Sequence, residues 1–558
     1  MLKKILIAIP VCLLAVSCKT PFKVENTRGD FEGYPISSEV FTTLQRTIVA
    51  DAIPSGSVKL FPYEVSKYQQ NGYGNWHYGP GLASEKRLDL MPAGYDGTST
   101  TNAAKLLNFF TLTDIHITDK ETPNQAIYMG YKGGIISAYS ATLLYSTHVL
   151  DAAVQTINAL HKQNPLDFGI SLGDAINSAQ YNELRWYVDV LDGKNINPDS
   201  GVKDDPVPGP HNDYQDEYKA AGLDKSIPWY QAIGNHDRFW MGSFTATDRI
   251  RQAYTGENIL EIGNIFTDPL RLESHGFYSG VLDGKTPLGD VIGAGPIADF
   301  ATPPKVAADP RRRPLSNKEW MSEFFKTASN PVGHGFTQAN LDKDFASYSF
   351  EPKSNIPIKV IVLDDIRKSG TGQGTLDNER YDWLVQELDK GQAEGKLMVI
   401  AAHIPIGVEE PGSMIGWVPS SPVSEATLIS KLHSYPNFIV WIAGHRHQNT
   451  VTAFKTPDSS RPELGFWEIE TPSLREFPQQ FRTFEIVRNS DNTISIKTTS
   501  VDPAVKDGSP AAQSRSYGIA AQRLFNSKFE PEYNAELVKQ LSPAMQAEIQ
   551  KYGTAINK

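Results

Sequence analysis

Residues 227–237 read Ile-Pro-Trp-Tyr-Gln-Ala-Ile-Gly-Asn-His-Asp. The apolar run over 227–233 predicts a strand, and the turn that follows it carries an amide, an imidazole and a carboxylate. In open α/β sheets the loops at the carboxyl ends of strands converge on a crevice where ligands bind. We therefore expect Asn235, His236 and Asp237 to have a functional role.

The same arrangement occurs at other places along the chain. Apolar runs at 106–113, 167–172, 397–402 and 438–443 are each followed by side chains that can bind a metal ion. These side chains are Asp114 and His116 after the first run, Asp174 after the second, His403 after the third, and His445 and His447 after the fourth. We expect all of them to meet at one edge of a sheet.

Segments with helical periodicity alternate with these strands. Residues 143–162 carry apolar side chains at helical spacing, which gives one face for packing against a sheet. We expect further helices at 182–191 and 377–390 and further strands at 358–363, 465–470, 481–487 and 493–499. Strands that alternate with helices predict an α/β fold.

Length and composition restrict the class of protein. The 558 residues exceed the roughly 250 to 300 at which a single core usually stops growing, so we expect a core with sizeable insertions. Hydrophobic residues make up 40% and charged residues 21%, which is typical of globular proteins. The net charge of −11 argues against a protein that grips nucleic acid phosphates.

The first 18 residues have the features of a bacterial export signal. Lys3 and Lys4 precede an apolar run that is too short to span a bilayer, which takes about 20 residues. Residues 15–18, Ala-Val-Ser-Cys, resemble a lipobox, so we expect acylation of Cys18 and anchoring in the cell envelope. The alternative is a soluble secreted protein. Cys12 and Cys18 are the two cysteines of the chain, so we expect a metal site built from nitrogen and oxygen ligands.

The remaining chain divides by composition. We expect a tether and N-terminal extension at 19–102, a catalytic domain at 103–502 and a tail with one or two short helices at 503–558. Residues 192–225, rich in Asp, Pro, Gly and Asn, and 238–357, with weak periodicity, are expected to be insertions. Arg311, Arg312 and Arg313 lie in the second insertion, where a charge run usually forms a solvated face.

The polar side chains at the strand ends suit a two-metal centre. Imidazole with carboxylate or amide oxygen favours Mn, Fe or Zn, whereas Mg²⁺ and Ca²⁺ favour shells of oxygen alone. Two cations about 3.5 to 4 Å apart can share a hydroxide and clamp a phosphoryl group during in-line attack. Asp174 has two carboxylate oxygens and could bridge both ions. A histidine outside the metal shell could protonate the leaving oxygen.

Taken in order, these blocks resemble the signature of the calcineurin-like metallophosphoesterase superfamily. They are Asp114-Ile115-His116, Gly173-Asp174, Gly234-Asn235-His236-Asp237, His403 and Gly444-His445-Arg446-His447. The resemblance implies a four-layer α/β/β/α sandwich, in which two packed mixed β-sheets are flanked by helices and carry long insertions. It covers residues from about 106 to 502.

The resemblance also implies a role for each residue. Asp114, His116 and His447 would hold one divalent ion, Asp174 would bridge, and Asn235, His403 and His445 would hold the other. His236 would act as the acid or stabilise the transition state. Asp237 would be the second catalytic residue, with the role of orienting its neighbour.

The function that we expect is a dinuclear metal-dependent phosphoester hydrolase acting on a small phosphomonoester or phosphodiester. Two alternatives remain open: a catalytically silent metal-binding scaffold, and a nuclease of the same superfamily. The negative net charge weighs against a nuclease, so we expect no nucleic acid partner. We expect the protein to contact a membrane only through the lipid at Cys18.

Overall fold

The structure is a computed structural model of the chain. It describes residues 31–556, except for residues 133–138, 203, 265–273, 283–285, 408–415, 419–420 and 526–533. The predicted export signal and Cys18 lie outside the described residues. Within the described part, no helix is both long and apolar enough to cross a membrane.

Two mixed β-sheets form the centre of the molecule. The first has six strands in the order β12-β13-β14-β15-β17-β16, with β13, β14, β15 and β17 parallel to one another. The bounds are β12 Tyr348–Phe350, β13 Ile358–Val362, β14 Leu397–Ala401, β15 Phe438–Ala443, β16 Thr450–Phe454 and β17 Phe466–Glu470. Full burial of β13, β14 and β15 explains their continuous apolar sequences.

The second sheet has eight strands. Its main path is β3-β20-β19-β18-β4-β5-β8, and β21 pairs with β4 outside this path. The bounds are β3 Glu85–Leu90, β4 Asn102–Leu112, β5 Phe168–Ser171, β8 Trp229–Gln231, β18 Phe481–Asn489, β19 Ile494–Val501, β20 Ala535–Lys539 and β21 Thr554–Ala555. Strands β4, β5 and β8 run parallel, whereas β18 and β19 are antiparallel to their neighbours.

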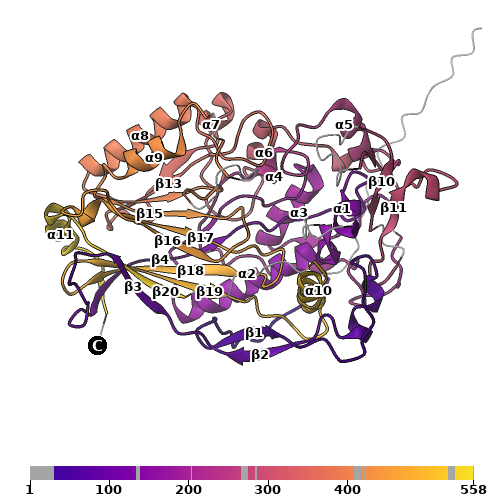
Figure 1. Ribbon diagram of the computed structural model, residues 1–558, viewed down its shortest axis with the longest axis horizontal. Coiled ribbons are helices and arrows are strands. Elements are labelled where there is room, and N and C mark those ends of the chain that lie inside the picture. The colour runs from indigo at the N-terminus through magenta and orange to yellow at the C-terminus, as the bar shows by residue number, and fades with distance from the viewer. Residues whose placement is uncertain are drawn as a thin grey trace, which may run out of the picture.

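Helices cover the outer faces of the two sheets. In Figure 1, α8 (Asn378–Ala393) and α9 (Glu425–Leu432) lie along the six-stranded sheet, and α2 (Ser146–Gln163) lies below the eight-stranded sheet. One continuous cluster of buried side chains includes residues of both sheets, and the hydroxyls of Thr111 and Thr471 lie 3.1 Å apart between the sheets. The predicted pair of mixed sheets flanked by helices is confirmed.

Most of the strands and helices expected from the sequence are present. Helix α3 spans Tyr181–Leu191, and the predicted helix at 143–162 begins as a 3-10 turn at Ala141–Tyr145 before α2. Strand β8 is shorter than the predicted 227–233. Before the strand, Pro228 lacks an N–H and cannot donate a backbone hydrogen bond. After the strand, the Ala232 N–H still donates to the Ser171 carbonyl at 2.8 Å.

Both flanks of the predicted domain contribute to the second sheet. Strand β20, from the expected tail, lies between β19 and β3, and β3 comes from the expected N-terminal extension. The tail also contains α10 (Pro510–Phe525) and α11 (Pro543–Ile549), and α10 is longer than the short helix expected. The sheet therefore extends beyond residues 103–502.

The two expected insertions differ in how much regular structure they contain. Residues 192–225 form a loop with one short pair of strands, β6 (Asn195–Ile196) and β7 (Tyr218–Lys219). Residues 238–357 contain α5, a small sheet of β9, β10 and β11, then α6 and α7, and end in β12 of the main sheet. Their bounds are α5 Asp248–Thr255, β9 Glu261–Ile262, β10 Phe277–Val281, β11 Ile292–Pro296, α6 Asn317–Glu323 and α7 Gln338–Lys343.

Shorter elements complete the described chain. A two-stranded antiparallel sheet of β1 and β2 precedes β3, α1 follows the first sequence block, and α4 begins within the third. Their bounds are β1 Arg46–Ala50, β2 Trp76–Pro80, α1 Ile127–Lys132 and α4 Asn235–Arg238, and further 3-10 helices lie at 65–67, 69–71, 297–299, 310–312 and 462–464.

In the arginine run, Arg311 and Arg313 are about half exposed, as expected of a solvated face, but Arg312 is not. The Arg312 side chain is fully buried, and its Nε donates to Asp119 at 2.9 Å. Arg311 and Arg313 pair with the nearby carboxylates of Asp309 and Glu319. The partner of Arg312 lies far away in the sequence, which is why a local charge pattern did not reveal it.

The position of β20 gives a test of the fold. Leu537 in β20 is fully buried, so Leu537→Ala should lower the free energy of unfolding by about 2 to 5 kcal/mol. Chemical denaturation followed by circular dichroism measures this change. Ile556→Ala, at a side chain that is 37% exposed, is the control and should change it by less than about 0.5 kcal/mol. Equal values for the two variants would contradict the placement of the tail in the sheet.

Candidate metal centre

The polar residues predicted at strand ends meet at one place in the structure. They follow β4, β5 and β8 of the eight-stranded sheet and β14 and β15 of the six-stranded sheet. The site therefore lies where the carboxyl ends of strands from both sheets face each other, and each sheet supplies part of it.

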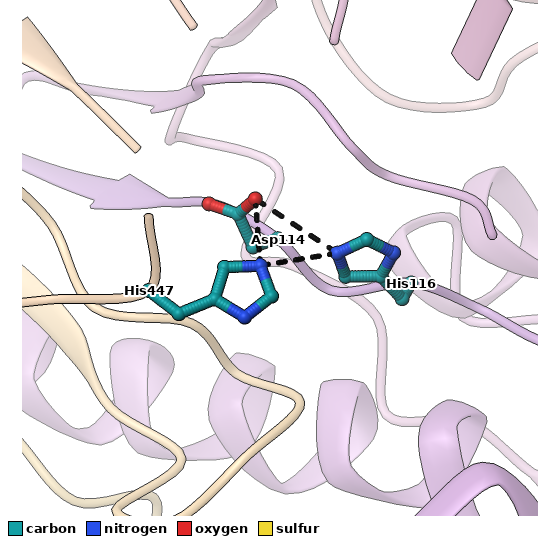
Figure 2. Close-up of side chains that lie close together, drawn as sticks. All are labelled: Asp114, His116 and His447. Atoms are coloured by element: carbon teal, nitrogen blue, oxygen red, sulfur yellow. Dashed lines mark hydrogen bonds and ion pairs between the residues drawn. The ribbon is translucent and has the colours of Figure 1, made fainter. Parts of the chain in front are cut away.

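Asp114, His116 and His447 form the first group. The Nε2 atom of His447 lies 3.1 Å from Asp114 Oδ1 and 3.3 Å from His116 Nε2. The Nε2 atom of His116 is 3.8 Å from the same Asp114 oxygen. Figure 2 shows the three side chains pointing toward one another, Asp114 and His116 from one loop and His447 from another. Their ligand atoms all lie within 4.8 Å of one another, close enough to hold one ion.

Asn235, His403 and His445 form the second group. Asn235 Oδ1 lies 2.9 Å from His403 Nε2 and 3.1 Å from His445 Nδ1. The amide nitrogen of Asn235 donates to the Gly242 carbonyl at 2.9 Å, which turns the amide oxygen toward the histidines. One oxygen and two imidazole nitrogens thus converge.

Asp174 lies between the two groups. Its Oδ2 atom is 3.4 Å from His403 Nε2 and 3.7 Å from His116 Nε2. Its Oδ1 atom accepts the backbone N–H of His236 at 2.7 Å, which fixes the orientation of the carboxylate. Asp174 is buried and lies near residues of both groups.

The hydrogen bonds of His403 show where a positive charge, from a proton or a metal ion, would lie. His403 Nδ1 lies 3.0 Å from the Leu172 carbonyl and must carry a proton to donate to it, so a neutral ring presents a lone pair at Nε2. That lone pair faces the oxygen of Asn235 rather than a donor. Acceptor atoms in contact repel unless a cation or proton lies between them. The residues present therefore fit a site for metal ions.

The backbone of the ligand loops is held in an unusual conformation. Asp114, His116, Asp174, His445 and His447 all have positive φ, between +49° and +75°. Non-glycine residues rarely adopt this region, and such strain gathers at functional sites where surrounding structure maintains it. Turns of this kind point consecutive side chains of a loop toward one centre.

At two positions of the sequence blocks, neighbouring atoms lie so close to the backbone that only glycine fits. A Cβ atom at Gly234 would lie 2.1 Å from Asp174 Oδ1, and one at Gly444 would lie 2.0 Å from Thr113 Oγ1. Any side chain at these positions would displace the carboxylates of the site. Glycine is required here to leave room rather than to bend the chain.

His236 lies beside the first group. Its Nδ1 atom is 2.7 Å from the Asn177 carbonyl, to which it donates, and its ring packs edge-on against His116 with centroids 4.5 Å apart. His236 also has a ring nitrogen within 4.8 Å of ligand atoms of His116 and Asp174. Burial lowers the pKa of His236, so the neutral ring is favoured.

Asp237 does not extend toward the other ligands. Its carboxylate accepts the backbone N–H groups of Gly234 at 2.8 Å and Ile176 at 3.2 Å. It therefore ties the loop after β8 to the loop after β5. Burial, together with the Asp174 carboxylate, raises the pKa of Asp237 to about 8. These contacts describe a positioning residue rather than one that touches a substrate.

Glu476 is a site residue that the sequence patterns did not reveal. Its carboxylate accepts a hydrogen bond from Nδ1 of His447, which leaves Nε2 of that ring facing Asp114. Such a carboxylate orients a metal-binding histidine and raises its basicity. Arg475 beside it donates to the His116 carbonyl at 2.8 Å. Both residues follow β17, at the same sheet edge as the predicted ligands. Their position after a predicted strand is the sequence signal that could have identified them as site residues.

No protein-family profile and no curated protein matches the sequence. Among solved structures, the chain is similar to a dimetal phosphatase from Danio rerio. The match has 12% sequence identity and a TM-score of 0.36, and it covers 72% of this chain and 100% of that chain.

The contact between Glu476 and His447 gives a test of the first group. Glu476→Gln should weaken binding of one metal ion by about 10- to 100-fold, because His447 loses the carboxylate that orients it. Elemental analysis after dialysis against graded chelator concentrations measures the loss. Glu548→Gln, which alters an exposed pair with Lys551, is the control and should retain the wild-type metal content. Equal metal retention in both variants would remove Glu476 from the site.

Proposed function

We propose that this protein is a dinuclear metal-dependent phosphoester hydrolase of the calcineurin-like type. The observation that carries the proposal is the arrangement of two ligand groups around one shared carboxylate, Asp174. Nitrogen and oxygen ligands of this kind favour Mn, Fe or Zn.

The ligand assignment follows the two groups. One ion would be held by Asp114, His116 and His447, the other by Asn235, His403 and His445, and Asp174 would reach both. Two divalent ions held by these residues would activate water and neutralise charge on the phosphoryl oxygens. The protein contributes the fixed positions, since every ligand lies directly after a strand of the core.

His236 is proposed as the group that assists departure of the leaving oxygen. Because Nδ1 donates to the Asn177 carbonyl, Nε2 is the ring atom left for the substrate, and it can donate a proton or a hydrogen bond once the ring is protonated. The Asn177 carbonyl also stabilises the protonated ring. Asp237 holds the loop that carries His236 and has no direct chemical step.

The substrate class is a phosphomonoester or phosphodiester of a small molecule. A net charge of −11 opposes binding to nucleic acid phosphates. We also propose that the protein acts in the bacterial cell envelope, tethered through a lipid at Cys18.

The activity is tested with aryl phosphate monoesters and diesters as substrates. Metal-free protein should be inactive, and adding back Mn²⁺, Fe²⁺ or Zn²⁺ should restore turnover together with two metal equivalents per chain. Protein that contains two equivalents of metal and hydrolyses neither ester would instead be a silent metal-binding scaffold. Cleavage of DNA at low salt in place of small esters would identify a nuclease.

The role of His236 is tested by substitution. His236→Ala should lower turnover by about 100-fold or more while metal content stays at the wild-type value, because the ring acts on the leaving group. Steady-state kinetics and elemental analysis of the same preparation separate the two effects. His77→Ala, at an exposed histidine paired with Asp51, is the matched control. Loss of metal together with activity would make His236 a ligand.

A further inference from the structure

The loop of residues 444–449 carries one proposed metal ligand from each of the two groups. His445 belongs to the second group and His447 to the first, and Arg446 lies between them. Both histidines have positive φ, +75° at His445 and +59° at His447. Residues other than glycine keep this conformation only where surrounding contacts determine it. The contacts around the loop therefore show how its two ligands are held.

Strand β17 lies beside both ends of this loop. The sheet order places β17 between β15, which leads into the loop, and β16, which follows it. The last residue of β17, Glu470, pairs with Ala443 of β15 on one side and with Thr450 of β16 on the other. Glu470 thus stands between the two ends of the ligand loop.

The Glu470 carboxylate reaches the middle of the loop. Its Oε1 atom accepts the backbone N–H of Arg446 at 3.1 Å, and its Oε2 atom accepts Arg446 Nη2 at 2.7 Å and Nε at 3.0 Å. Oε2 also accepts the Thr450 hydroxyl at 3.2 Å. Glu470 is fully buried, and the Arg446 side chain is 12% exposed. One carboxylate therefore contacts both the backbone and the side chain of the residue between the two histidines.

We propose that Arg446 and Glu470 form a positioning unit that places His445 and His447 at the two metal positions. Neither residue belongs to the ligand set, and both act through the backbone from which the two imidazoles project. The inference rests on the proposed function, because it takes the two ligand groups as metal sites. Since the unit lies between ligands of different groups, its loss should weaken the binding of both ions.

The same loop also contacts a ligand from the other sheet. The backbone N–H of His445 donates to Asp114 Oδ2 at 2.9 Å. A shift of the loop would therefore disturb Asp114 in the first group as well as the two histidines. Glu476 differs in this respect, because its contact is with the His447 ring and not with the loop backbone.

The chemistry of the pair suits a role in positioning. A guanidinium that donates through two nitrogens to one carboxylate fixes direction as well as distance. Removing one partner of a buried ion pair is destabilising because it leaves a charge unpaired, whereas replacing both partners removes that penalty. Stability and positioning can therefore be separated: a double substitution should recover stability without restoring the hold on the loop.

Metal binding by three variants of the full chain tests the unit. The variants are Arg446→Gln, Glu470→Gln and the double variant. Metal-loaded protein is dialysed against graded chelator concentrations, and the retained metal is measured by elemental analysis. All three variants should bind both ions at least about 10-fold more weakly than the wild type. The visible absorption of Co²⁺-loaded protein, which depends on ligand geometry, should also change in all three.

The melting temperature of the metal-free protein is the second measurement. Each single variant should melt below the wild type, and the double variant should melt above the less stable single variant. Despite that recovery, the double variant should bind metal no more tightly than the single variants. Should Glu470→Gln fail to fold, Arg446→Gln decides the question, because the Arg446 side chain reaches the surface.

A second ion pair of the same sheet provides the matched control. Glu387→Gln breaks the contact of Glu387 with the buried Lys359, at 2.6 Å, which joins α8 to β13. This variant should lower the melting temperature and leave the metal content and the Co²⁺ spectrum at their wild-type values. Loss of metal in this control would mean that metal release follows general destabilisation, which would overturn the inference.

The outcomes that overturn the inference are distinct from those that contradict the hydrolase. Wild-type chelator profiles in Arg446→Gln, loss of one ion only, or recovery of metal affinity in the double variant would each overturn the positioning unit. Ester hydrolysis is assayed separately on the metal-loaded wild type. Wild-type protein that binds two ions but hydrolyses no ester would contradict the proposed function alone.

Discussion

Crowding of acceptor atoms at the carboxyl ends of strands from both sheets is the constraint on which the site depends. His403 Nε2 lies 3.4 Å from Asp174 Oδ2 and 2.9 Å from Asn235 Oδ1, and both of these oxygens are acceptors. The fold holds them together through strands that are buried on both faces. The energy that this convergence costs is offset when cations bind, which couples the loops to the metal content.

Surrounding contacts keep the ligands in place. Glycines at 234 and 444 allow the loops to approach the carboxylates, and Asp237 ties two of the loops through backbone N–H groups. Glu476 fixes the ring of His447 from the outer side. The positive φ angles of the ligands persist because these contacts determine the loop conformations from several directions.

The sequence predicted the parts of the structure that have local signals. Apolar runs followed by Asp, Asn or His, as at Asp114 and His403, mark buried strands and their loops without knowledge of the fold. Strand β20 was missed because its sequence, Ala-Glu-Leu-Val-Lys, is short and mixed and is stabilised by pairing with distant strands. Glu476 and Arg312 were missed as site and core residues because their partners lie far away in the chain.

Arg312 links three segments that are remote in sequence. From the second insertion it reaches Asp119 in the loop after β4 and Ser200 in the first insertion, and it is fully buried. Removing the second insertion would leave the buried carboxylate of Asp119 without its cation, which is strongly unfavourable, whereas removing the first would cost Arg312 its hydrogen bonds to one neutral hydroxyl. A chimera that exchanges the second insertion would therefore need to supply a new cation for Asp119 or replace that carboxylate as well.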